Sequence, residues 1–133
     1  QPVELNSVDS AGLDDLKGIG PAFAMRILRY KDLLGGYAIP EQLLEVYGLD
    51  STLYQLILPF VNIDPDLIKR ININLCPLPA LKKHPYIGYY VAKAIADYRV
   101  KHGRFRTVEE VRLLPGMTPG KFNQLKPYLI VVE

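Results

Sequence analysis

The chain has 133 residues and a mass of 15.0 kDa, which fits one ordinary domain or two very small ones, and its 49% hydrophobic content is enough to build a core. Charged residues make up 23% and no residue type dominates, so a disordered chain, a collagen and a disulfide-rich scaffold are all poor fits. The single cysteine, Cys76, has no partners at metal-ligand spacing, and no apolar run approaches the roughly 20 residues that span a bilayer.

The charge is distributed unevenly along the chain. Residues 1–67 carry four basic and ten acidic side chains, a net charge of −6, whereas residues 68–133 carry twelve basic and four acidic, a net charge of +8. Such an asymmetry indicates either an anionic partner for the second half or an attraction between the halves.

The first half predicts four short helices. Asp9 or Ser10 can cap a helix that runs through Leu13 and Leu16 and ends before the Gly18-Ile19-Gly20 turn. The second helix begins at Pro21, and the glycines at 35 and 36 end it. A third helix starts near Pro40, and a fourth follows Gly48 and ends at Pro59.

The second half repeats this plan. A shift of 68 residues aligns the sequence on itself without gaps, which is the signature of a duplicated unit. The identical pairs include Asn6 and Asn74, Leu13 and Leu81, Ile19 and Ile87, Gly20 and Gly88, Ala24 and Ala92, Tyr30 and Tyr98, Gly48 and Gly116. Aromatic residues also recur, as Tyr37 and Phe105 and as Tyr54 and Phe122, so we expect small aromatic cores.

The predicted class is all-α, with two tandem units that each form a small four-helix bundle similar to a SAM domain. We expect an acidic first unit over residues 1–64, a linker over 65–70 and a basic second unit over 71–133. An alternation typical of strands is confined to residues 71–74 and 130–132.

The pattern from Leu13 and Leu16 through Gly18-Ile19-Gly20 to Ala24 and Ile27 resembles the helix-hairpin-helix motif. The longer frame, which extends to residues 43–49, is similar to the tandem-hairpin domain of the ComEA family of competence proteins. The resemblance covers nearly the whole chain, twice. It implies a small, non-enzymatic module that binds DNA without regard to sequence.

Such a turn has a physical reason to bind DNA. Glycines on either side of an apolar residue can adopt positive φ and leave no side chain between the backbone amides and a ligand. The amides that open the following helix make a natural phosphate site, and contacts of this kind carry no base information. In the turn at 18–20 (hairpin 1), we expect Gly18 and Gly20 to present backbone, Ile19 to anchor the turn, and Lys17 and Arg26 to add cationic contacts.

The other three hairpins depart from this pattern. In hairpin 2 (48–50), Asp50 replaces the second glycine, and a carboxylate there repels phosphate or caps the next helix, so we interpret this hairpin as structural. In hairpin 3 (86–88), Tyr86 replaces the first glycine, which puts its backbone contacts in doubt. Hairpin 4 (116–118) departs only at Thr118, whose hydroxyl can donate to a phosphate, and it is the best candidate in the basic unit.

We therefore hypothesise that the second unit binds double-stranded DNA and that the first unit packs, spaces or docks a protein partner. The predicted contacts in the second unit are Gly88, Lys93, Arg104, Arg106, Gly116, Thr118, Gly120 and Lys121. Alternatively, these cations are ordinary surface charges or pair with the acids of the first unit, and the chain is a helical interaction scaffold that has lost DNA binding.

We expect no catalytic residues, no metal site and no cofactor. His84 and His102 lie among lysines without a nucleophile or carboxylate arranged for acid–base work, so we expect both at the surface. Tyr86, Tyr89 and Tyr90 can stack on exposed bases or cover an interface. A monovalent cation at a hairpin is left open.

We expect no membrane contact by this segment itself. The chain begins at Gln1 rather than at a methionine, which suggests a processed or excised segment. The ComEA resemblance implies the bacterial cell envelope, with an anchor outside this chain.

Overall fold

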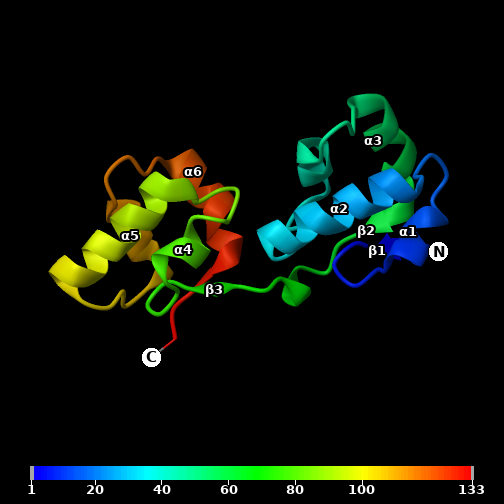
Figure 1. Cartoon of the computed structure of the whole chain (residues 1–133). Helices are drawn as coiled ribbons and strands as arrows, with labels where there is room; N and C mark the ends of the chain where they lie inside the picture. The colour runs from blue at the N-terminus through cyan, green and yellow to red at the C-terminus, as the bar shows by residue number, and fades with distance from the viewer. Residues whose placement is uncertain (1, 133) are drawn as a thin grey trace. The chain divides into compact units, whose positions relative to one another are not determined.

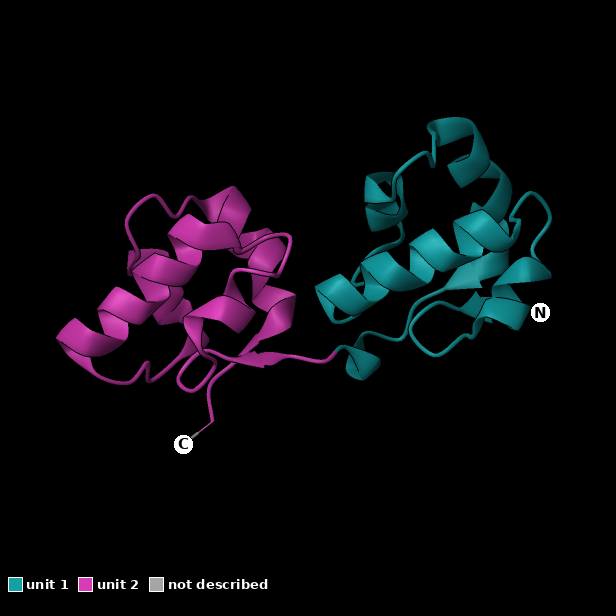
Figure 2. Cartoon of the chain, viewed as in Figure 1, with its two compact units in different colours: residues 1–68 teal, residues 69–133 magenta. Residues whose placement is uncertain are grey.

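The computed structural model describes residues 2–132. It forms two compact units, residues 1–68 (unit 1) and residues 69–133 (unit 2), which Figure 2 colours separately. Both units are mostly helical (Figure 1). The predicted linker contains one 3₁₀ turn, η3 (Pro65–Leu67).

The two units have the same order of elements, as the duplicated sequence predicts. Unit 1 contains β1 (Val3–Glu4), α1 (Ser10–Asp14), α2 (Pro21–Leu34), η1 (Pro40–Glu45), α3 (Ser51–Ile57), η2 (Leu58–Phe60) and β2 (Val61–Asn62). Unit 2 contains β3 (Ile71–Asn72), α4 (Leu78–Leu81), α5 (Gly88–His102), η4 (Val108–Leu113), α6 (Pro119–Leu125), η5 (Lys126–Tyr128) and β4 (Leu129–Ile130). The third helix of each unit is thus a 3₁₀ helix, and a further 3₁₀ turn follows the fourth.

Two short parallel ladders modify the expected all-α class. β1 pairs with β2, and β3 pairs with β4, so the first and last strands of each unit lie side by side. The alternation over residues 71–74 and 130–132 marks the β3–β4 pair, whereas nothing in the sequence pattern marked β1 and β2. The ladders satisfy backbone groups that extended segments would otherwise leave unpaired. The class is therefore mostly helical, with a small strand pair closing each unit.

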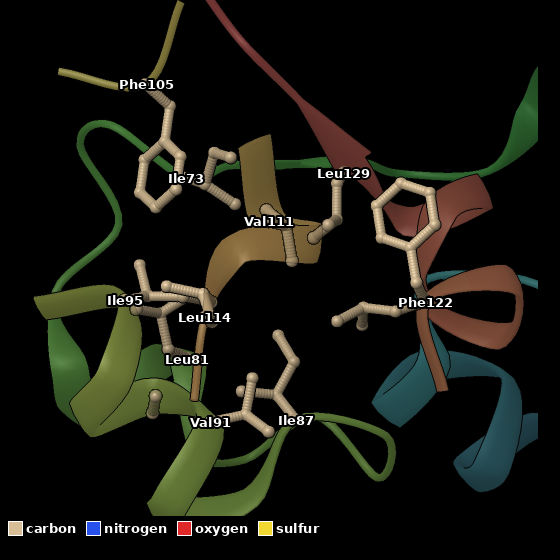
Figure 3. Packing of buried hydrophobic residues seen from close by; sticks show 12 residues of the cluster. Ile73, Leu81, Ile87, Val91, Ile95, Phe105, Val111, Leu114, Phe122 and Leu129 are labelled. Carbon is tan, nitrogen blue, oxygen red and sulfur yellow. The ribbon is translucent and has the colours of Figure 1, made fainter. Parts of the chain in front are cut away.

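Each unit has its own core. In unit 2 the buried cluster gathers side chains from α4, α5, η4, α6 and β4, among them Leu81, Ile95, Val111 and Phe122, and Phe105 joins it from the loop after α5 (Figure 3). The matching positions of unit 1, among them Leu13, Ile27, Tyr37 and Tyr54, are buried as well. The expectation of aromatic residues in both cores is confirmed at Tyr37 and Phe105 and at Tyr54 and Phe122.

An asparagine fixes the loop that follows the long helix in each unit. The Asn6 amide donates to the Tyr37 carbonyl at 2.9 Å, and its oxygen accepts the Tyr37 N–H at 2.7 Å. Asn74 makes the same pair of bonds with Phe105, at 3.0 and 2.7 Å. Each asparagine thus satisfies both polar groups of one residue, as a neighbouring strand would.

Candidate nucleic-acid interface

The four hairpins share one backbone device. In each, the N–H of the central residue donates to the carbonyl three residues earlier, at 3.0–3.1 Å, and the central side chain points toward the core. Ile19, Leu49 and Ile87 are buried, and Met117 is half-buried. The predicted anchoring role of Ile19 therefore fits its burial, and because its N–H is already bonded to Leu16, it presents no amide to a ligand.

Hairpin 1 has an open backbone. Gly18 adopts φ +94°, and Gly20 stands extended before Pro21. Lys17, Gly18 and Gly20 are exposed, and a Cβ built on Gly20 would meet nothing within 4 Å. The charge around it is unfavourable, however, because Asp14 and Asp15 are also exposed and unit 1 is acidic overall.

Arg26 lies at hairpin 2 instead of hairpin 1. Its guanidinium donates to the Tyr47 carbonyl at 3.2 Å and lies about 5 Å from the ring centres of Phe23 and Tyr47. A Cβ built on Gly48 would be 2.8 Å from Arg26 Nη1, so the arginine lies against this turn. The expectation that Arg26 supports hairpin 1 does not match this placement, because the cation is held by the carbonyl and the two rings.

The capping role proposed for Asp50 is confirmed. Its carboxylate accepts the N–H of Leu53 at 2.8 Å at the start of α3. Hairpin 2 thus presents a carboxylate and a glycine with Arg26 close beside it.

Hairpin 3 has a different backbone from hairpin 1. Since Tyr86 stands where hairpin 1 has Gly18, the positive φ moves to Gly88, at +66°. The amides of Tyr86, Ile87 and Gly88 all donate to His84, the first to its ring Nδ1 at 3.1 Å and the others to its carbonyl. Gly88 is half-buried, and because its N–H is bonded within the turn, it is not available to a ligand.

The expectation that His84 lies at the surface is wrong. It is 4% exposed, and its ring packs 4.8 Å from that of Tyr128 and 5.5 Å from that of Tyr86. His84 occupies the position of the buried Leu16 in the repeat, and that register outweighs its lysine neighbours. Tyr86 accordingly belongs to this aromatic cluster.

Hairpin 4 is exposed throughout its predicted contact residues. Gly116 has φ +77° and open space at its Cβ position, and Thr118, Gly120 and Lys121 are exposed. The Thr118 oxygen accepts the N–H of Lys121 at 3.2 Å. Because a hydroxyl both accepts and donates, its proton can still bond a phosphate oxygen.

The cations of unit 2 fall into two groups. Arg99 is structural, since its Nη1 donates to the carbonyls of Ile73 and Cys76. Lys93 pairs with Asp97 at 2.9 Å, which raises the pKa of Lys93, and Arg112 and Lys126 both pair with Glu109. Within residues 2–132, no salt bridge engages Arg104, Arg106, Lys121, Lys82, Lys83 or Lys101.

Arg104 and Arg106 lie on either side of Phe105, a residue whose position is fixed by burial and by hydrogen bonds. Both are exposed, while Phe105 between them is buried and held by Asn74. Arg104 reaches the Val132 carbonyl only at 3.5 Å. Of the predicted contacts, hairpin 4, Lys121, Arg104 and Arg106 thus remain exposed and form no salt bridge among residues 2–132, although the backbone N–H of Arg106 donates to Glu110, whereas Gly88 and Lys93 are engaged within the unit.

A groove next to hairpin 4 was not predicted from the sequence. It is lined by Tyr90, Lys93 and Ala94 of α5 and by Leu113 and Pro115, with a volume of about 700 Å³. The signal for it was present in the repeat, since Ala94 aligns with Arg26 under the 68-residue shift. Tyr89 and Tyr90 are exposed at the start of α5, with their ring centres 5.5 Å apart.

Two further properties concern the described part of the chain. Among residues 2–132, no group of three or more His, Cys, Asp or Glu side chains is arranged to hold a metal ion. In the same range, the helices are too short or too polar to cross a membrane.

Comparison with known proteins gives two kinds of match. Residues 1–62 and 67–130 each match the family described as helix-hairpin-helix motif. ComE operon protein 1 of Bacillus subtilis is 33% identical over 61 residues, which cover 46% of this chain and 30% of that protein.

The second kind of match is to animal proteins. Endonuclease/exonuclease/phosphatase family domain-containing protein 1 is 25% identical in Danio rerio over 98% of this chain and 22% identical in Mus musculus over 93%. The chain spans 27% of the length of each of these relatives.

Proposed function

Because this chain belongs to the helix-hairpin-helix family, as a tandem pair of ComEA-like units, we propose that it binds double-stranded DNA through the phosphate backbone, without reading sequence. Unit 2 makes the main contact, and hairpin 4 is its centre. The observation that carries this proposal is the exposed Gly116–Thr118 turn of unit 2, followed closely by Lys121, which forms no salt bridge among residues 2–132.

The supporting physics is electrostatic. An open turn with a glycine at positive φ lets a phosphate approach the backbone, and Lys121 beside it adds a charge. Arg104 and Arg106 are two further exposed cations of unit 2. Unit 1 has the more regular turn, hairpin 1, but its net charge of −6 over residues 1–67 opposes an anionic ligand.

The test is the salt dependence of binding to a random-sequence duplex, followed by fluorescence anisotropy. Four to six neutralised phosphates give a slope of log K against log salt of about −4 to −5, from about −0.9 per contact. Arg104→Ala, Arg106→Ala and Lys121→Ala should each weaken binding and reduce the slope by about 1. Arg29→Ala removes the same charge from an exposed position of unit 1 and serves as the matched control.

The alternative is a helical interaction scaffold that has lost DNA binding. It predicts that the apparent affinity for the duplex does not change with salt concentration and that all four variants have the same affinity as the native chain. A slope near zero would therefore overturn the proposal and favour the scaffold.

We further propose that the module binds without catalysing a reaction and that it serves DNA uptake, as its similarity to ComE operon protein 1 suggests. A chimera of that protein carrying this chain in place of its matched segment should support uptake of labelled DNA. Failure of a well-folded, DNA-binding chimera to do so would reject the uptake role while leaving DNA binding intact.

A further inference from the structure

The groove beside hairpin 4 has a counterpart in unit 1 that is filled. Under the 68-residue shift, Phe23, Arg26 and Tyr47 correspond to Val91, Ala94 and Pro115. In unit 1 the Arg26 guanidinium lies near both aromatic rings and donates to the Tyr47 carbonyl. In unit 2 the position of Arg26 holds a methyl group, and Ala94 lines an open groove.

The space beside the glycines of hairpins 2 and 4 shows the same difference between a filled and an open site. A Cβ on Gly48 would be 2.8 Å from Arg26, whereas one on Gly116 would meet nothing within 4 Å. Unit 1 therefore shows what occupies this space, a planar guanidinium about 5 Å from two aromatic ring centres, and unit 2 leaves the space open.

The lining of the groove is suited to a flat ligand that is attached to an anion. Tyr90 offers an aromatic face that is 85% exposed, and Ala94, Leu113 and Pro115 add apolar surface. Lys93 and Lys101 line the groove too, together with Asp97 and His102 as hydrogen-bonding groups. Its volume of about 700 Å³ lies within the usual range of small-ligand sites, about 300–1,000 Å³.

We propose that this groove takes an unpaired nucleobase of a DNA strand whose backbone lies on hairpin 4, with the base stacked on Tyr90. A base has a π-face for the tyrosine and a polar edge for the groove, and Lys101, which forms no salt bridge among residues 2–132, attracts its phosphate. The inference rests on the proposed function, because it needs the strand at hairpin 4. A paired base is stacked inside the duplex and cannot reach the groove without being extruded, so unit 2 should prefer a duplex that carries an unpaired nucleotide.

The test compares binding of the full chain to two labelled probes, a fully paired duplex and the same duplex with one unpaired nucleotide. We expect the second to bind about 5- to 150-fold more tightly, the range expected when one base stacks on one aromatic ring. Tyr90→Ala removes the ring, and Ala94→Met fills the groove without adding charge. Both variants should lose the preference and retain the affinity for the paired duplex.

Tyr47→Ala is the matched control, because it removes a tyrosine that is 82% exposed at hairpin 2, outside the groove. It should keep the preference. Circular dichroism of each variant checks that the fold is intact.

The outcomes separate the two proposals. Equal binding of both probes by the native chain, or a preference that survives both Tyr90→Ala and Ala94→Met, overturns the nucleobase site and leaves phosphate binding standing. If the native chain binds neither probe, the proposed function itself is overturned.

Discussion

The asparagines at positions 6 and 74 show how one side chain organises a unit. Each bonds both the N–H and the carbonyl of a residue 31 positions later, Tyr37 or Phe105, whose aromatic ring is buried. An aspartate would keep the acceptor and lose the donor, and an alanine would lose both. The loop after the long helix is therefore fixed by two hydrogen bonds that no other residue type makes equally well.

Asn74→Ala should lower the free energy of unfolding of unit 2 by about 1–3 kcal/mol, because it leaves part-buried polar groups of Phe105 without partners. Urea unfolding followed by circular dichroism measures this loss. Asn74→Asp, which retains the bond from the Phe105 N–H, should fall between the native chain and the alanine variant. A loss below about 0.5 kcal/mol would show that water replaces the asparagine at little cost.

A pH effect is expected at Glu110. Its carboxylate accepts from the Tyr98 hydroxyl at 2.7 Å and from the N–H groups of Thr107 and Arg106, and these bonds, the tyrosine first, lower the pKa of Glu110 below its ordinary 4.5. Its contribution is therefore complete above about pH 4.5 and is lost as the pH falls through the lowered pKa.

Unit 1 supplies the matched variant for this effect, because Gln42 occupies the same position and accepts the N–H groups of Ala38 and Ile39. Glu110→Gln should keep the cap and reduce the acid sensitivity of unit 2. Urea unfolding at pH 5 and at about pH 3 tests this. If the unfolding free energy of the Glu110→Gln variant fell between pH 5 and about pH 3 by as much as that of the native chain, the acid sensitivity would belong to other carboxylates.

At the scale of elements, hairpins 2 and 4 also differ in the residue that caps the next helix. Asp50 caps α3 with a carboxylate, and Thr118 caps α6 with a hydroxyl. Both residue types stabilise a helix start to a similar degree, but only the aspartate repels a phosphate. The cap can thus be exchanged to change the charge of the turn without changing its geometry.

Thr118→Asp should leave the stability of unit 2 within about 0.5 kcal/mol and weaken duplex binding at least about fivefold at low salt. Thr118→Asn, a neutral cap, should retain most of the affinity. Thermal unfolding and anisotropy measure the two properties separately. Equal affinities of the aspartate and asparagine variants would place the phosphate away from hairpin 4.

Local signals in the sequence predicted most of the helical elements. Asp9 caps α1 with its side chain, Pro21 begins α2, and Gly35 ends α2 with φ +94°, a conformation that favours glycine. These features depend on neighbours within a few residues. The 68-residue shift then extended them from one unit to the other.

What the sequence did not reveal depends on contacts between distant segments. The pairing of β1 with β2 joins the two ends of unit 1. A strand of two residues is too short to show the alternation of apolar and polar residues that would predict it. Arg26 was assigned to the hairpin that precedes its helix, but its length carries the guanidinium to the carbonyl of Tyr47. The lysine neighbours of His84 predict a surface position, whereas its register with the buried Leu16 places it in the core.

At the scale of the whole molecule, the chain combines two similar folds with opposite charge. Each unit has a core of its own, and unit 2 carries twelve of the sixteen basic side chains. Duplication followed by a change of surface charge leaves the hairpins in place and alters which of them can meet a polyanion. DNA binding should therefore divide unequally between the units.

Residues 69–133 alone should bind duplex DNA with a salt slope close to that of the full chain, and residues 1–68 alone should bind at least about tenfold more weakly. Circular dichroism first establishes that each fragment folds, since units of this size are only marginally stable. Comparable affinity of the two fragments would show that hairpin 1 compensates for its acidic surroundings.

The strand pairs have a mechanical consequence. The chain enters unit 1 along β1 and leaves along β2, and because these strands are parallel, entry and exit lie at opposite ends of one ladder. The β3–β4 pair repeats the arrangement in unit 2. Tension applied to the ends of a unit therefore acts along its strands, so that the ladder bonds, such as that from the Leu5 N–H to Asn62, are loaded together in shear and do not open one after another.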